Sequence, residues 1–81
     1  MATALRKHMP PTNALVVFEA AGRHMNFTRA AKELDVTQSA VSRQIQLLEE
    51  FLGLSVFQRQ SRGLMLTPAG ERLHRAVTMG L

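Results

Sequence analysis

One stretch of the chain, residues 38–52, divides into an apolar and a polar face when it is drawn as a helix. With about 100° between successive residues, one arc collects the apolar side chains, and only Gln44 falls among them as a polar residue. The apolar arc consists of Ala40, Val41, Ile45, Leu47, Leu48, Phe51 and Leu52. Four of these are expected to be buried, at about 1.5–3 kcal/mol each before entropy is subtracted. They are Val41, Ile45, Leu48 and Leu52.

The polar face of this helix changes in character along its length. Its first half carries donors, acceptors and one cation, namely Gln38, Ser39, Ser42, Arg43 and Gln46. Its last turns carry Glu49 and Glu50. Because DNA repels carboxylates, only the first half suits a major groove, as in helix-turn-helix docking. Arg can pair with guanine, Gln with adenine and Ser with either, and Ala40 can contact a thymine methyl group.

Start signals upstream of this stretch predict two further helices. The first covers about 13–24 and is capped by Thr12 or Asn13. The second is short, covers 29–34 and has Thr28 as its expected N-cap.

A tight turn is predicted between the second and third helices. It falls at Asp35 and Val36, since Asp is one of the few residues that tolerate the left-handed conformation. Thr37 then caps the helix 38–52, and Gly53 suits its C-terminal end. The order of short helix, turn and two-faced helix predicts a helix-turn-helix.

A β-hairpin is predicted after this helix. Two short strands, 55–59 and 63–66, are joined by a turn at 60–63. The hairpin carries Arg59 and Arg62. An arginine at its tip can reach a phosphate or a narrow minor groove, although a solvated turn residue is the simpler alternative.

The predicted fold class is therefore mainly α with a small β-hairpin, a winged helix-turn-helix followed by the start of a linker helix. Residues 1–11, which end in two prolines, are expected to form a flexible arm. The winged helix-turn-helix covers 12–66. The linker helix covers 67–81 and opens with Thr as N-cap and Pro in the first turn.

Composition narrows the class of protein. Ten basic and six acidic residues give a net charge of +4, which favours a polyanionic partner over an acidic substrate. A mildly basic domain without a nucleic-acid role remains the alternative. The absence of cysteine excludes disulfides and thiolate metal sites and suits a reducing cytosol. No apolar run approaches the roughly 18 residues that a membrane span needs, so no membrane partner is expected.

No residue pattern predicts catalysis or a cofactor. His8, His24 and His74 lack metal-ligand spacing and are expected at the surface. No serine has a base placed to activate it, and no glycine-rich phosphate loop is present. Met65 and Met79 are expected to pack or to form a dimer face. We therefore expect a protein that is not an enzyme and that uses no cofactor and no metal.

Linked motifs in this chain resemble the N-terminal domain of LysR-type transcriptional regulators. NFTRAAKEL at 26–34 is similar to the second helix of that family, and VTQSAVSRQI at 36–45 to its recognition helix. The similarity continues through 48–54, 56–59 and 66–70, so it covers nearly all of the chain from Pro11 onward. The opening residues, Pro11–Leu15 and Phe18–Ala21, are most similar to the branch that contains the glycine-cleavage activator and the β-lactamase regulator.

The resemblance implies a set of DNA contacts. Thr28 and Arg29 would bind backbone phosphates, and Thr37 would lie near another phosphate. The wing contacts would come from Arg59 and Arg62. The residues placed in the major groove are Gln38, Ser39, Ala40, Ser42 and Arg43, to which the polar face adds Gln46.

The resemblance also implies partners. One partner is double-stranded DNA with an inverted repeat, and the other is a second copy of the chain, bound through the linker helix that begins near Thr67. The full-length protein would form a tetramer. A small-molecule effector would bind only a C-terminal domain outside this chain, and the protein would act in the bacterial cytoplasm, at the nucleoid. The alternative function is a protein-interaction or dimerisation module that acts through the linker helix.

Overall fold

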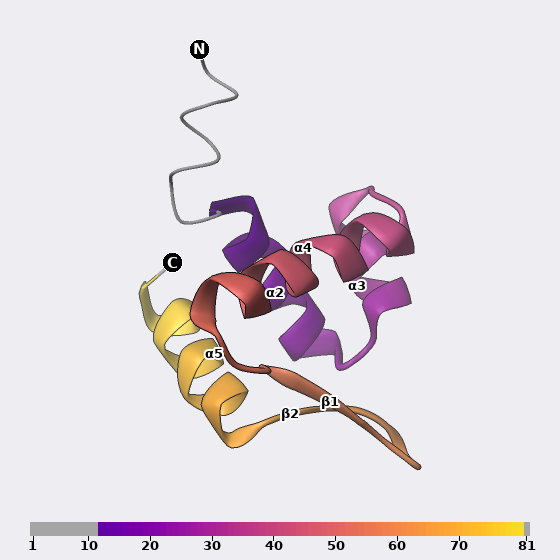
Figure 1. The fold of residues 1–81 in the computed structure, drawn as a ribbon. Coiled ribbons are helices and arrows are strands. Elements are labelled where there is room, and N and C mark those ends of the chain that lie inside the picture. Colours follow the sequence, from indigo (N-terminus) through magenta and orange to yellow (C-terminus); the bar gives the residue numbers. More distant parts are fainter. Residues whose placement is uncertain (1–11, 81) are drawn as a thin grey trace.

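The computed structural model describes residues 12–80 of the chain as four helices and one antiparallel hairpin (Figure 1). In chain order the elements are α2 (Thr12–His24), α3 (Phe27–Leu34), α4 (Gln38–Leu52), β1 (Phe57–Gln60), β2 (Gly63–Leu66) and α5 (Pro68–Gly80). The predicted fold class, mainly helical with a small hairpin, is confirmed. The arm predicted at residues 1–11 lies outside the described residues.

A line of apolar side chains anchors α4 to the rest of the fold. Val41, Ile45 and Leu48 are at most 3% exposed, and α4 packs against both α2 and α3. The rest of the core comprises Ala14, Val17, Phe18, Ala20, Ala21, Ala30, Ala31, Val56, Phe57 and Leu66. Every buried side chain of the described residues is apolar, so the polar groups of this domain lie at or near its surface.

The prediction that Leu52 is buried is wrong. Leu52 is 37% exposed, Leu47 is also 37% exposed, and Phe51 is 61% exposed. The apolar arc of α4 is wider than the surface that α2 and α3 cover. The last turn of α4 therefore presents apolar side chains to solvent.

The predicted caps hold at α4 but not at α2 or α3. α2 begins at Thr12 and contains both Thr12 and Asn13, so neither of these precedes the helix as its cap. Thr37 and Gly53 cap α4 as predicted, and Asp35 adopts the left-handed conformation at φ 58°. The cap of α3 is Asn26 rather than Thr28, because Asn26 Oδ1 accepts the backbone N–H of Arg29 at 2.9 Å. The Asn carboxamide reaches this donor from the residue before Phe27, so α3 begins earlier than predicted.

The hairpin is shorter at its start than predicted. Phe57 pairs with Leu66 and Gln60 with Gly63, which leaves a two-residue turn at 61–62. Ser55 lies before β1 rather than in it. Ser55 and Val56 are instead hydrogen-bonded to Glu49 of α4 and to Thr67, so the strand ladder begins only at Phe57.

Aromatic rings join α2, the hairpin and α5. Phe18 meets Phe57 and His74 edge to face, with ring centroids 5.6 Å apart in both pairs. The expected surface position of His74 is wrong, because its ring is half-buried and Nε2 lies 3.0 Å from the Glu19 carbonyl oxygen. α5 thus packs on α2 through this histidine.

Candidate nucleic-acid interface

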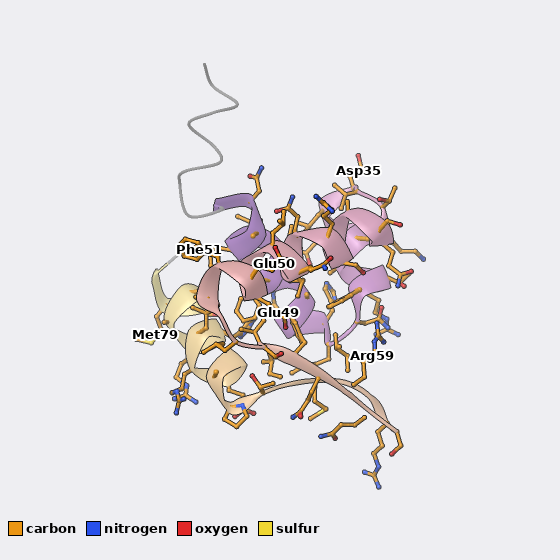
Figure 2. The ribbon with its side chains drawn as sticks, viewed as in Figure 1. Asp35, Glu49, Glu50, Phe51, Arg59 and Met79 are labelled. Carbon is orange, nitrogen blue, oxygen red and sulfur yellow. The ribbon has the colours of Figure 1, made fainter. Side chains whose placement is uncertain are left out.

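The turn between α3 and α4 fixes the angle between the two helices. The N–H of Asp35 donates to the Lys32 carbonyl at 3.3 Å, and the N–H of Val36 donates to the Ala31 carbonyl at 3.0 Å. Figure 2 shows Asp35 at the outer edge of this turn. Because the turn satisfies the last carbonyls of α3, the start of α4 has a defined position against it.

The N-terminus of α4 has the features of an anion site. Thr37 Oγ1 accepts the N–H of Ala40 at 3.1 Å, and the helical ladder begins with the N–H of Val41 bound to the Thr37 carbonyl at 3.2 Å. The N–H groups of Gln38 and Ser39 therefore precede the ladder and point outward at the positive end of the helix dipole. Since the Thr37 hydroxyl oxygen acts as an acceptor here, its proton remains available for a phosphate oxygen.

The side chains predicted to read bases are accessible. Gln38, Ser39, Ala40, Arg43 and Gln46 are exposed, whereas Ser42 is half-buried. Thr28 and Arg29 are also exposed, near the N-terminus of α3. Since none of these side chains is packed in the core, all of them can meet a ligand from outside.

A shallow cleft of about 160 Å³ joins the polar face of α4 to the hairpin. Ser42 and Gln46 of α4 lie on one side of it and Arg59 of β1 lies on the other. The full lining is Phe27, Ser42, Ile45, Gln46, Glu49, Phe57, Gln58, Arg59 and Leu64. The predicted wing and the predicted recognition helix therefore open to the same side of the molecule.

Three other predicted residues, Thr28, Arg29 and Arg62, do not line this cleft. Arg62 is exposed in the turn at the hairpin tip, which projects away from the helices (Figure 1). Thr28 and Arg29 belong to α3. The predicted set thus forms three separate groups, on α3, on α4 and on the hairpin.

Two residues of this surface have roles that the sequence did not reveal. The sequence places Glu49 on the polar face of α4, and in the structure its Oε2 accepts the N–H of Val56 at 2.9 Å and that of Phe57 at 3.3 Å. The guanidinium of Arg59 lies over the ring of Phe27, 6.0 Å from its centroid. Neither contact follows a helical or strand spacing, so no periodicity in the sequence signals it.

A separate charge cluster links α2 to α3. Arg23 is hydrogen-bonded to both Glu19 and Glu33 at distances of 2.8–2.9 Å, and His24 Nε2 lies 2.7 Å from Glu33. Hydrogen bonds from Arg23, and then from His24, lower the pKa of Glu33 to about 2. The same arginine lowers the pKa of Glu19. The positive charge of Arg23 is therefore paired with carboxylates of the fold.

Among residues 12–80, no three His, Asp or Glu side chains come together in a way that would hold a metal ion. Within the same range, no helix has both the length and the apolar character needed to cross a bilayer.

A helix-turn-helix with a hairpin beside its second helix defines the winged helix-turn-helix class. The chain matches, over residues 12–71, the family described as "Bacterial regulatory helix-turn-helix protein, lysR family", and it belongs to that family.

Curated relatives and solved structures agree with this assignment. The chain is 60% identical over 67 residues to the glycine cleavage system transcriptional activator of Escherichia coli, covering 83% of this chain and 22% of the relative. It is 59% identical over 69 residues to the transcriptional activator AmpR of Pseudomonas aeruginosa, covering 85% of this chain and 23% of the relative. The chain thus spans about a fifth of the length of these relatives.

A solved structure is also similar to this fold. It is the crystal structure of the BenM DBD/benA site 1 DNA complex, with a TM-score of 0.78 and 37% identity. The match covers 83% of this chain and 75% of the solved chain. The predicted resemblance to LysR-type regulators, including the branch of the glycine-cleavage activator, is confirmed.

Proposed function

We propose that this chain binds double-stranded DNA as the DNA-binding domain of a LysR-type transcriptional regulator. Residues 12–66 form the DNA-binding unit, and residues 67–81 begin the linker helix. One observation carries the proposal: the polar first half of α4 is accessible and shares a cleft with Arg59 of the hairpin, while Val41, Ile45 and Leu48 bury the opposite side of the helix in the core. The similarity to the DNA complex of BenM supports the same conclusion.

In this proposal the first half of α4 enters the major groove. Arg43 can form a bidentate pair with guanine, Gln38 and Gln46 can pair with adenine, and the two serines can bond to several base edges. Ala40 can contact a thymine methyl group. The full set of proposed base-reading residues is Gln38, Ser39, Ala40, Ser42, Arg43 and Gln46.

The remaining predicted residues bind the DNA backbone. Thr37 and the free N–H groups at the start of α4 bind one phosphate, as helix N-termini commonly do. Thr28 and Arg29 bind a second phosphate beside α3. Arg59 and Arg62 of the wing lie on the backbone or in the adjacent minor groove. These contacts fix the register of α4 in the groove and carry no sequence information themselves.

We also propose that two copies bind an inverted repeat as a homodimer through α5. Apolar side chains remain exposed at the end of α4 and on α5, and Figure 2 shows Phe51 and Met79 on the side away from Arg59. Phe51 is 61% exposed and Met79 is 83% exposed. A dimer that covers these side chains leaves both reading helices free for DNA.

The full-length protein is proposed to be a tetramer in the bacterial cytoplasm, at the nucleoid. Its small-molecule effector binds a C-terminal domain outside this chain. The relatives are about four to five times longer than the segment they share with this chain, which leaves room for such a domain.

Selection of bound duplexes from a random pool tests the proposed function. We expect a half-site repeated with inverted symmetry. With the selected duplex, log K should fall linearly with log salt, at a slope of about −0.9 for each phosphate neutralised. A pool that yields no enriched sequence would contradict sequence-specific binding.

An amide chemical-shift titration with the same duplex separates this function from the interaction module. We expect shifts at the start of α4 and in the hairpin. Shifts confined to residues 70–81 would instead favour a module that acts through the linker helix.

A further inference from the structure

The root of the hairpin, residues 55–57, is attached to α4 by one side chain. Glu49 Oε2 accepts the N–H groups of Val56 and Phe57 at 2.9 and 3.3 Å. Figure 2 shows Glu49 between α4 and the start of β1. Glu49 also lines the cleft that contains Gln46 and Arg59. The carboxylate therefore links the reading helix directly to the backbone that leads into the wing.

The opposite side of the hairpin root is attached to the start of α5. Thr67 Oγ1 donates to the Ser55 carbonyl at 2.8 Å, and the Thr67 N–H donates to the Val56 carbonyl at 3.0 Å. A Cβ placed on Gly70 would lie 2.0 Å from that Val56 oxygen, so only glycine permits this approach. The root is thus held from two sides, by α4 through Glu49 and by α5 through Thr67.

We propose that Glu49 is a positioning residue that sets where Arg59 and Arg62 lie relative to the reading face of α4. The proposal rests on the proposed DNA-binding function. Two backbone N–H groups share one carboxylate, and charged acceptors form stronger hydrogen bonds than neutral ones. Without this acceptor the two donors turn to water, and the hairpin root keeps its hydrogen bonds to Thr67 and the packing of Phe57 on Phe18 and Phe27, but no hydrogen bond to α4.

If only the charge of Glu49 mattered, its removal should strengthen DNA binding, whereas loss of its positioning role should weaken binding. A carboxylate beside bound DNA repels the phosphates, so removing it should strengthen binding. Glu50 is the matched control, because it is the neighbouring carboxylate of α4 and is exposed. If Glu49 acts only through its charge, Glu49→Ala and Glu50→Ala should behave alike.

The test compares the affinity of three variants for one selected duplex at fixed salt. We expect Glu49→Ala to bind roughly tenfold more weakly, the scale of one hydrogen bond to a charged group. Its salt slope should become shallower by about 0.9 for each wing–phosphate contact that is lost. Glu50→Ala should bind as tightly as the unmodified chain or more tightly. Glu49→Gln, which keeps an oxygen acceptor without the charge, should bind more tightly than Glu49→Ala and more weakly than the unmodified chain.

A double-variant comparison separates positioning from a general loss of stability. In the Arg59→Ala/Arg62→Ala background, Glu49→Ala should have little further effect on affinity, because the groups it positions are absent. An equal tenfold loss in both backgrounds would overturn the proposal. So would binding by Glu49→Ala that is as tight as that of Glu50→Ala. Thermal unfolding of each variant serves as the control that the helices remain folded at the assay temperature.

A measurement without DNA keeps this inference separate from the proposed function. Residual dipolar couplings of the hairpin amides, 57–66, report the orientation of the wing against α4 in the free chain. We expect Glu49→Ala to change them and Glu49→Gln to change them less. Unchanged couplings in Glu49→Ala would overturn the positioning role even if DNA binding were confirmed, whereas failure of the unmodified chain to bind DNA would overturn only the function.

Discussion

The ring of His74 on α5 meets the ring of Phe18 on α2 edge to face, with centroids 5.6 Å apart. Nε2 of the same histidine lies 3.0 Å from the Glu19 carbonyl, and because a carbonyl only accepts, this nitrogen is the donor. Gly22 leaves the space, since a Cβ there would lie 2.5 Å from His74 Cδ2. One side chain thus supplies both an apolar and a polar contact between the two helices.

Replacement of this histidine should loosen α5. His74→Ala removes a hydrogen bond and an aromatic contact, so we expect the free energy of unfolding to fall by about 1–3 kcal/mol. Urea unfolding followed by circular dichroism measures the change. His24→Ala is the control, because it removes only a contact at the surface with Glu33. Equal effects of the two substitutions would argue against the docking role of His74.

Loss of the Asn26 cap of α3 should lower the stability of the fold. Asn26→Ala should lower the free energy of unfolding by about 1 kcal/mol, because the N–H of Arg29 loses its acceptor. Thr28→Ala should change stability by less than about 0.5 kcal/mol, since Thr28 is exposed and does not cap the helix. Thermal unfolding of the two variants compares them directly. A larger loss for Thr28→Ala would contradict the observed cap.

The close approach of α5 to the hairpin root requires glycine at position 70. A Cβ on Gly70 collides with backbone, which cannot rotate away, so Gly70→Ala should destabilise the fold by several kcal/mol or prevent folding. Gly80 lies on the same helix, and among the described residues no atom lies within 4 Å of a Cβ built there. Gly80→Ala should therefore leave the melting temperature unchanged or raise it slightly. Similar melting temperatures for both variants would contradict the contact.

The charge cluster between α2 and α3 makes the stability depend on pH. Glu33 has an ordinary pKa of 4.5 and a folded pKa of about 2, because Arg23 and then His24 bind its ionised form. A lowered folded pKa stabilises the protein above pH 4.5, and this contribution is lost as the pH falls from about 4.5 to 2. Urea midpoints across this range should fall less steeply for Glu33→Gln than for the unmodified chain. Glu50→Gln should keep the original steepness.

Base reading and backbone binding should separate in two arginine variants. Arg43→Ala should cost about 1–3 kcal/mol on the selected duplex and relax the preference at particular bases, if Arg43 pairs with guanine. Arg62→Ala should weaken all duplexes evenly and make the salt slope shallower by about 0.9. Affinity measured on the selected duplex and on its single-base variants distinguishes the two. A uniform loss for Arg43→Ala would remove its base-reading role.

Much of the fold follows from local sequence signals. Periodicity predicted the inner face of α4 through Val41, Ile45 and Leu48, and cap chemistry predicted Thr37 and Gly53. These features depend on residues within a few positions of one another. Local physics is therefore enough to predict them.

The errors arise where distant segments meet. Whether Leu52 is buried depends on how far α2 and α3 extend along α4, which periodicity does not encode. The role of Glu49 depends on its contact with the start of the hairpin, and that of His74 on the packing of α5 against α2. Both contacts join segments that lie apart in the sequence. At the candidate site, the accessible face of α4 was predictable, but the contacts that fix the hairpin against it were not.

The wholly apolar core of the described residues has an evolutionary consequence. Because no buried side chain carries a hydrogen bond that the surface must complete, substitutions on the exposed start of α4 need not disturb the packing beneath it. Duplicated copies of such a domain can therefore vary on this face one residue at a time without repacking the core.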